Sequence, residues 1–292
     1  QAAVYCVIVG FSNFDITTKY IFDYETPQTE PHEVRAKNIN PYLVDTDDIT
    51  IENRNEPICN VPSISFGSMP NDDGNFLFTD KEKEDFLLKE PGAKKYIKPL
   101  ISAKEFLNGE KRWCLWLENI SPAELRALPA VLKRVENVKK YRLNSQREAT
   151  VKLAAYPYLF GEIRQPNSEF VLIPRHSSEN RKYIPIGFFD KSFIGSDSCS
   201  IIPEASFLHF GILTSLMHNA WMRQVCGRIK SDYRYSNKLV YNNFPFPQSA
   251  TEKQKTLVED AVKKMLLVRK KYFAKDSTLA DLYDPNAMPK DL

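Results

Sequence analysis

The chain has 292 residues, 42% of them hydrophobic, and a formal net charge of +3. This length allows one large domain or two modest ones with a substantial core, and no apolar run reaches the roughly 18 to 20 residues of a membrane-spanning helix. The five cysteines are scattered, with no CxxC pair and no histidine at zinc-ligand spacing, so the pattern excludes common zinc modules and favours buried free thiols in a cytoplasmic protein.

The N-terminal part predicts two strands and a polar connection. Apolar residues fill 2–11, a second strand-like run covers 17–24, and a Gly-Phe-Ser-Asn turn lies between them. Residues from about 26 to 56 are polar and predict a connecting stretch. The first run has no basic lead-in and no cleavage site, so we interpret it as a buried strand of a longer protein rather than as a signal peptide.

Short elements are expected next. A turn is predicted at Met69–Gly74, between two apolar runs. Thr79 can cap a short amphipathic helix that extends to Lys89. The aromatic and apolar run Arg112–Leu117 follows an Asn-Gly dipeptide and predicts a strand.

A helical region follows this strand. Ser121 and Glu124 form a capping box around a proline at the first helical position. Pro129 is expected to interrupt that helix, and a longer helix is expected from about 130 to 154. Its apolar stripe has helical spacing and consists of Leu125, Leu128, Leu132, Val135 and Val138.

The second half predicts strands and then helices. Strand-like pieces cover 160–165, 169–175, 182–189 and 199–203, and an apolar helix is expected from about 205 to 225, ended by Gly227. A broken, basic and aromatic segment follows, then a last helix at about Glu252–Phe273 and an irregular tail. This mixture without regular βαβ alternation predicts an α+β fold with mixed or antiparallel sheets, several helices and a small helical C-terminal segment.

Charge is distributed unevenly along the chain. Pro41–Glu90 holds 12 acidic and 4 basic residues, whereas Lys133–Lys182 holds 11 basic and 5 acidic residues. Arg223–Lys238 adds 5 basic residues against 1 acidic residue. A polyanion would therefore meet a local positive field that the small net charge hides.

Familiar catalytic motifs are absent from the sequence. It has no glycine-rich phosphate cradle, no GxSxG elbow and no HExxH helix. Two of the four histidines, His209 and His218, lie on the apolar 205–225 helix and are expected in or near the core. Asn40-Pro41-Tyr42 is similar to part of an amino-methylase loop but lacks its second proline. We therefore expect neither catalytic nor metal-binding residues in this chain.

Two segments carry groups suited to DNA contact. Residues 175–182 lie between two predicted strands, and arginine, asparagine and glutamate can each read base edges. The candidate base-reading residues are Arg175, Ser177, Glu179, Asn180 and Arg181. Residues 231–236 combine hydroxyl-bearing and aromatic side chains with one basic side chain. The candidate phosphate contacts, taken from the 130–154 helix, the end of the 175–182 segment and the basic 223–238 stretch, are Lys133, Arg134, Lys140, Arg147, Lys182, Arg228, Lys230, Tyr233 and Arg234. Without DNA contact, residues 175–182 would be a polar hairpin turn and residues 231–236 a tyrosine-anchored surface loop.

Several long blocks follow one another in an order that resembles a known family. The blocks are FGSMPNDDGNF, ISAKEFLNGEKRWCLWL, LFGEIRQPNSEFVLIPRHSSENRKYIPIGF, FGILTSLMHNAW, CGRIKSDYRYSNKLVYNNFPFP and LADLYDPNAMPKDL. They resemble the C-terminal half of the MmeI-type, or type IIL, restriction–modification proteins. The Asn-Phe-Pro-x-Pro ending after a basic loop is also similar to the recognition domains of type I specificity subunits.

The resemblance implies a division of the chain into three parts. Residues 1–35 would be the last strands of a methyltransferase domain and a linker. Residues 36–247 would be a DNA target-recognition domain, and 248–292 a helical C-terminal segment. The family implies a parent polypeptide with a nuclease, a helical spacer and an adenine-N6 methyltransferase that uses S-adenosylmethionine.

The chain departs from the full family pattern in one respect. The cofactor-binding glycine motif, the Asn-Pro-Pro-aromatic loop and the nuclease are all missing. The sequence therefore predicts a non-catalytic fragment that holds no cofactor and reads duplex DNA, without a membrane partner. Its other partners would be the methyltransferase and nuclease domains of the parent, with S-adenosylmethionine in the former.

Two other interpretations stay open at this point. The acidic stretch at 40–90 and the basic stretch at 133–182 are suited to a protein-interaction module that binds a methylase or nuclease subunit without reading DNA. A small hydrolase could use His176 with Asp197 or Glu162, although the sequence alone does not bring a nucleophile, a base and an orienting group together.

Overall fold

The computed structural model describes residues 7–26 and 28–292, and it divides the chain into two compact units at 1–54 and 55–292. Cys6 and the first half of the predicted N-terminal strand lie outside the described residues. No helix in the described ranges is both long and apolar enough to cross a membrane.

The first unit is built on one antiparallel strand pair. Strand β1 (Lys19–Asp23) pairs with β2 (His32–Ala36), with Ile21 opposite Val34. The predicted polar connection is therefore wrong at 32–36, where β1 provides a partner for a segment of low strand propensity. The apolar residues 7–11, which belong to the described part of the predicted first strand, have no strand conformation, and their side chains are exposed.

The Asn-Pro-Tyr segment forms a turn in this unit. The side-chain oxygen of Asn40 accepts hydrogen bonds from the backbone N–H groups of Tyr42 and Val44, at 2.9 and 3.3 Å. Asn40 is 4% exposed, and Leu43 adopts a left-handed φ of 61°. The asparagine thus stabilises a local turn.

The second unit begins with a four-stranded sheet of order β10-β5-β6-β4. Its strands are β4 (Leu77–Phe78), β5 (Ile97–Ile101), β6 (Arg112–Leu115) and β10 (Ile194–Gly195). Among the strand pairs that the structure describes, only β10–β5 is parallel. Strand β5 connects two cores, because Leu100 belongs to the core under this sheet and Ile101 to the core of the next.

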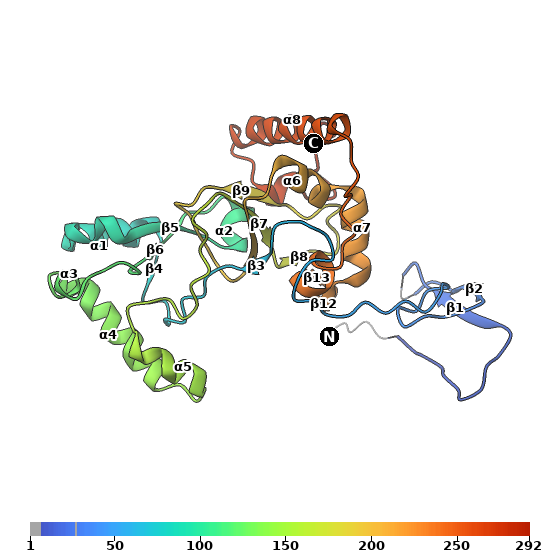
Figure 1. Cartoon of the computed structure of the whole chain (residues 1–292), viewed down its shortest axis with the longest axis horizontal. Coiled ribbons are helices and arrows are strands. Elements are labelled where there is room, and N and C mark those ends of the chain that lie inside the picture. Colours follow the sequence, from blue (N-terminus) through green and yellow to red (C-terminus); the bar gives the residue numbers. More distant parts are fainter. Residues whose placement is uncertain (1–6, 27) are drawn as a thin grey trace. The chain divides into compact units, whose positions relative to one another are not determined.

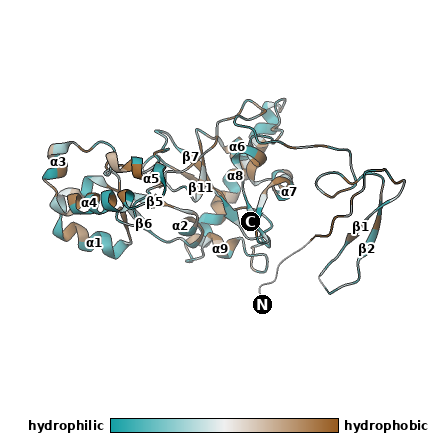
Figure 2. Ribbon diagram, turned by 90° about the horizontal axis from the view of Figure 1, so that it is seen from below, coloured by the Kyte–Doolittle hydropathy of each residue, from teal (hydrophilic) through white to brown (hydrophobic). Residues whose placement is uncertain are grey.

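Several helices belong to the stretch that forms this first sheet. They are α1 (Asp80–Lys89), the 3-10 helix η1 (Pro91–Tyr96), α2 (Ala103–Asn108), α3 (Pro122–Arg126), α4 (Pro129–Leu143), α5 (Glu148–Lys152) and the 3-10 helix η2 (Leu153–Ala155). Helices α1, α3, α4 and α5 lie at the left of Figure 1, whereas α2 packs against the core of the next sheet. The predicted capping box at Ser121 is formed, and the predicted cap at Thr79 is formed as a capping box with Glu82. Val135 and Val138 of the predicted stripe are buried, and the ribbon of α4 alternates hydrophilic and hydrophobic turns (Figure 2).

The predicted helix from 130 to 154 is interrupted. Helix α4 ends at Leu143, and α5 starts only at Glu148. Between them the Ser145 hydroxyl accepts a hydrogen bond from the Arg147 backbone N–H at 3.1 Å. A serine that bonds to the local backbone competes with the helical ladder, which explains the interruption.

The buried side chain of Arg142 holds this region together. Its Nε donates to the carbonyl of Asn71 at 3.0 Å, and its Nη atoms donate to the carbonyls of four further residues at 2.8 to 3.2 Å: Pro70, Leu153, Tyr156 and Leu159. All five N–H donors of a guanidinium are thereby used. Arg142 is 1% exposed, and burial lowers the pKa of its guanidinium.

A second four-stranded sheet has the order β3-β11-β7-β9 and is antiparallel throughout. Its strands are β3 (Ser65–Phe66), β7 (Phe170–Pro174), β9 (Gly187–Phe189) and β11 (Cys199–Pro203). Three predicted strands are found here: the strand at 199–203 has the predicted bounds, and those at 169–175 and 182–189 are shortened. The predicted strand at 160–165 contributes only an isolated bridge between Met69 and Glu162.

Helices of the C-terminal part cover this region. They are α6 (Phe207–Thr214), α7 (Leu216–Val225), the π-helix η3 (Asn237–Tyr241), α8 (Glu252–Phe273) and α9 (Leu279–Leu282). The predicted single helix at 205–225 is divided by Ser215, which caps α6 at its end and α7 at its start. Cys226 ends α7 in an extended conformation, so Gly227 begins a strand instead of providing the expected left-handed cap.

Two close contacts connect α8 to the rest of this unit. A side chain on Gly211 of α6 would collide with Val258, so the glycine allows the two helices to approach. Arg269 of α8 is buried and donates to the carbonyl of Ile186 at 2.6 Å and to the hydroxyl of Tyr283. The C-terminal helices are therefore part of the same packed unit.

A small three-stranded sheet of order β12-β13-β8 completes the fold. Its strands are β8 (His176–Ser177), β12 (Gly227–Ile229) and β13 (Asp232–Arg234). The sequence prediction missed all three, because each has only two or three residues. Together with the other sheets and helices they confirm the predicted α+β class.

We expect Arg142→Met to lower the free energy of unfolding by about 3 kcal/mol or more, because it leaves buried carbonyls without donors. Arg142→Lys keeps the charge and up to three donors and should cost less. Urea unfolding followed by circular dichroism measures both, with the exposed Arg126→Met as control. Equal unfolding midpoints for Arg142→Met and the parent chain would contradict this role.

The buried His218 predicts a loss of stability in acid. Its Nδ1 lies 3.0 Å from the Leu213 carbonyl, so Nδ1 carries the proton and Nε2 accepts from the Tyr235 hydroxyl at 3.1 Å. Burial lowers the pKa of His218 to about 4. The unfolded chain therefore binds the proton more readily as pH falls below about 6.5, and stability should drop by about 3 kcal/mol between pH 6.5 and 4.

Thermal unfolding across that pH range tests the assignment. His218→Gln should be less stable at neutral pH but should show a shallower dependence on pH. A variant that keeps the full slope would assign the acid sensitivity to another group.

Candidate nucleic-acid interface

The three-stranded sheet joins the two basic segments that the sequence analysis singled out. In the antiparallel β13–β8 pair, Arg234 lies opposite His176 and Tyr233 lies opposite Ser177. Strand β12 pairs with the other edge of β13. Segments around 176 and 234 thus become neighbours, as Figure 1 shows for β8, β12 and β13. We call these three strands the basic sheet.

Strand alternation decides which side chains of the basic sheet are accessible. His176 and Arg234 are exposed, whereas Ser177 and Tyr233 are only 4% and 7% exposed. The expected base contact by Ser177 and phosphate contact by Tyr233 are therefore corrected, since both side chains point inward. The ring of Tyr233 instead supports the Arg228 guanidinium, which lies 4.4 Å from its centroid.

Arg175 lies where the basic sheet meets the second sheet. Its Nη1 donates to the Asp197 carbonyl at 2.9 Å, and its guanidinium lies 4.1 Å from the centre of the Phe66 ring. Burial and the neighbouring Arg234 lower the pKa of Arg175. These contacts hold the side chain and position the strand, and the expected bidentate base contact by Arg175 stays a prediction.

The turn at 178–182 is held mainly through its backbone. The Glu179 N–H donates to the Asp232 carboxylate at 3.2 Å, and the Arg181 N–H donates to the Ser178 carbonyl at 3.2 Å. Arg223 of α7 donates to the carbonyl of Lys182. These contacts fix the path of the chain while engaging few of its side chains.

The side chains of this turn differ in accessibility. Asn180 and Lys182 are exposed, and Glu179 and Arg181 are half-buried. The Glu179 carboxylate lies 4.0 Å from Arg228, and burial lowers the pKa of Arg181. A pocket of about 400 Å³ is lined by Ser178, Asn180 and Arg181 of the turn and by Ala280, Asp284, Pro285 and Asn286.

The β12–β13 hairpin presents the remaining candidates of this segment. Arg228 and Lys230 are exposed, and the Arg228 guanidinium donates to the Ser231 carbonyl at 2.9 Å. Lys230 lies in the hairpin turn with a left-handed φ of 56°. The hairpin therefore carries two accessible cations in addition to Arg234.

The four candidates on α4 and around α5 lie on a different part of the unit. Lys133, Lys140 and Arg147 are exposed. Arg134 is not free, because its Nη1 donates to the Asn75 carbonyl at 2.6 Å and its guanidinium lies 4.2 Å from the Phe78 ring. The expected phosphate contact by Arg134 is corrected to a packing role.

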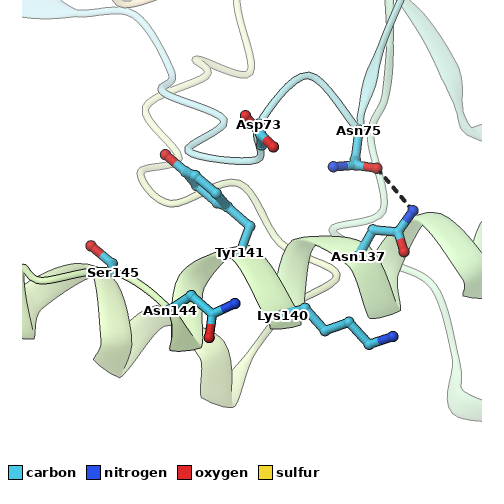
Figure 3. Close-up of a pocket in the computed structure, with 7 residues that line it drawn as sticks. All are labelled: Asp73, Asn75, Asn137, Lys140, Tyr141, Asn144 and Ser145. Carbon is cyan, nitrogen blue, oxygen red and sulfur yellow. Dashed lines mark hydrogen bonds between the residues drawn. The ribbon is translucent and has the colours of Figure 1, made fainter.

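A polar pocket of about 580 Å³ lies between α4 and the loop at 71–75 (Figure 3). It is lined by Asp73, Asn75, Asn137, Lys140, Tyr141, Asn144 and Ser145. The Asn137 amide donates to the Asn75 side-chain oxygen at 3.2 Å, and Tyr141 points from α4 toward the loop. Asp73 and Gly74 have left-handed φ values of 53° and 76°, which give the loop its tight shape. Lys140 thus borders a surface rich in amides and hydroxyls.

The side chains of the hydrolase interpretation, His176, Asp197 and Glu162, have other partners in the structure. His176 faces Arg234 across the basic sheet, whereas the Glu162 carboxylate pairs with Arg164. The Asp197 carboxylate accepts a hydrogen bond from the Ser196 hydroxyl at 3.2 Å. Within the described ranges no group of three or more metal-ligating side chains comes together.

The cysteines that the structure describes are free thiols. Cys114 and Cys199 are fully buried, and burial raises the pKa of both, to about 12 for Cys199. Cys59 and Cys226 are partly exposed. The prediction of free thiols therefore holds for these four, and Cys6 lies outside the described residues.

One accessible residue of this interface was missed. His176 is exposed beside Arg234, but the sequence analysis left it out of both candidate groups. Strict alternation along 170–177 would have placed His176 and Ser177 on opposite faces. Deciding which of the two faces outward required the pairing with β13.

Comparison with known proteins matches two adjoining family models. Residues 45–248 match the MmeI target recognition domain, and residues 250–292 match the MmeI C-terminal domain. DNA methyltransferase A of Bacillus subtilis (strain 168) is 39% identical over 293 residues, which cover 100% of this chain and 32% of that protein.

A solved structure matches the fold over nearly the whole chain. It is the type IIL restriction–modification enzyme MmeI in complex with DNA, with 46% sequence identity and a TM-score of 0.91 over 96% of this chain and 37% of that one. The chain thus spans about a third of the length of these relatives.

Proposed function

This chain belongs to the MmeI family, as a target-recognition domain joined to a C-terminal domain, and we propose that it reads the DNA sequence at which a restriction–modification methyltransferase acts. The observation that carries the proposal is the basic sheet with its adjoining 178–182 turn. Two segments that are far apart in the sequence and rich in cations and amides form one accessible surface there.

The proposal divides the accessible side chains by role. Glu179, Asn180 and Arg181 belong to the turn and carry groups that match base edges in the major groove. The exposed cations that suit phosphates are Lys182 at the end of the turn, Arg228 beside Glu179, and Lys230 and Arg234 on the β12–β13 hairpin. Lys133, Lys140 and Arg147 would provide a second set of phosphate contacts on α4 and around α5. Arg175, held by Asp197 and Phe66, keeps the strand before the turn in place.

The chemistry of modification belongs to the parent protein in this proposal. We propose an S-adenosylmethionine-dependent adenine-N6 methyltransferase, with a nuclease as a further partner domain. Asn40 does not fit a catalytic or cofactor-binding role, because its side-chain oxygen is bonded within its own turn and the residue is buried. Detection of N6-methyladenine in DNA from cells that express the full-length protein tests the reaction.

A protein partner is the second candidate function. Large apolar side chains are exposed on α7 and α8, including Leu216 and Met217 at 60% and 72%, and Leu257 and Leu267 at 62% and 65%. The charged stretches are less available, since Arg134 and Arg142 already donate to carbonyls of the 70–75 loop. Association with a methylase subunit without DNA affinity would favour this alternative.

We expect Arg181→Ala to weaken binding to the target duplex by about 1–3 kcal/mol while binding to unrelated duplexes changes little. Fluorescence anisotropy of the full-length protein with target and scrambled duplexes measures the difference. Arg126→Ala removes an exposed arginine outside the interface and should leave both affinities unchanged. Equal losses on both duplexes would assign Arg181 to phosphate binding instead.

We expect Lys230→Gly to weaken all duplexes alike and to reduce the slope of log affinity against log salt by about 1. Glycine is used because the left-handed φ of 56° at this position strains other replacements. A salt series with the scrambled duplex provides the measurement. An unchanged slope would exclude a phosphate contact at the hairpin turn.

A further inference from the structure

One row of residues crosses the three strands of the basic sheet. Gly227 of β12, Arg234 of β13 and His176 of β8 lie opposite one another in register. Because directly opposite residues share one face of a sheet, the side chains of Arg234 and His176 are neighbours. A side chain placed on Gly227 would meet no atom within 4 Å, so the end of the row beside Arg234 is open.

This row is positively charged and lacks an internal counter-ion. Neither His176 nor Arg234 forms a salt bridge within the described residues. The carboxylate of Asp232, which acts electrostatically on His176, accepts a hydrogen bond from the Glu179 backbone. Arg175 lies beside them, and burial followed by the charges of Arg175 and Arg234 lowers the pKa of His176, against the opposing effect of Asp232.

A second positive charge in this row is unfavourable without a ligand. Like charges directly opposite each other destabilise a strand pair, so a protonated His176 opposite Arg234 and close to Arg175 is disfavoured. An anion bound between the two side chains would offset this repulsion and allow both to carry a charge. Both groups are exposed, and no side chain blocks the approach at Gly227.

We propose that His176 and Arg234 together bind one phosphate of the DNA backbone and that His176 takes up a proton when it does so. This inference rests on the proposed function, since it assigns one contact within the DNA interface. Arg234 supplies a permanent charge and a two-pronged donor, and protonated His176 adds a second charge and a further donor.

Proton uptake makes the affinity depend on pH. The bound phosphate stabilises the charged imidazole, and by linkage the charged imidazole binds the phosphate more tightly. The unbound protein holds His176 neutral at pH 7 and above, because the group titrates below its usual range. DNA affinity should therefore rise as pH falls from about 7.5 toward 5.5.

The experiment measures affinity of the full-length protein for labelled target and scrambled duplexes by fluorescence anisotropy, from pH 5.5 to 8.0 at constant ionic strength. Wild type should gain about three- to tenfold over His176→Gln as the pH falls. His176→Arg carries a permanent charge and should bind tightly across the whole range. His209→Gln is the matched control, because glutamine can keep the capping box of α6, and it should behave as wild type.

Three results would overturn the inference. DNA binding with the same pH dependence in wild type and His176→Gln removes the assignment but leaves the proposed function intact. A loss in His176→Gln that affects only the target duplex makes His176 a base contact instead. The absence of DNA binding by wild type at every pH removes both the inference and the proposed function.

Discussion

Five backbone carbonyls converge on the guanidinium of Arg142, and much of the first half of the second unit depends on this contact. The carbonyls come from the loop before β4, from η2 and from the segment at 156–159. None of these stretches forms a regular strand pair with its neighbours. The carbonyls of Pro70, Leu153 and Tyr156 each accept one backbone N–H, whereas those of Asn71 and Leu159 accept from the guanidinium. A single long side chain thus connects all five and fixes the loop beside the polar pocket.

Individual arginine side chains also hold the basic sheet in place. Strands of two or three residues are too short to be stable by themselves, and β8 and the turn after it are held by neighbouring side chains. Arg175 attaches β8 to the second sheet through Asp197 and Phe66, and Arg223 attaches the following turn to α7. The interface is therefore placed by contacts with the core, although it lies at the surface.

The parts that could be predicted from sequence are those whose signal is local. The capping boxes at Thr79 and Ser121 contain their own hydrogen-bond partners, and the helices began where they indicated. The inward positions of Ser177 and Tyr233 could not be predicted, because they depend on a pairing between segments 53 or more residues apart. Likewise the division of the apolar helix at Ser215 depends on a capping contact that competes closely with helix continuation.

The way the 178–182 turn is held has a consequence for the evolution of this protein. Its main anchors are the Glu179 and Arg181 N–H groups and the Lys182 carbonyl, and every residue except proline offers such backbone groups. Most substitutions at Glu179, Asn180 or Arg181 therefore alter the chemical surface of the turn while keeping its shape. Single substitutions can therefore change which chemical groups the turn selects while the protein remains folded at each step of its evolution.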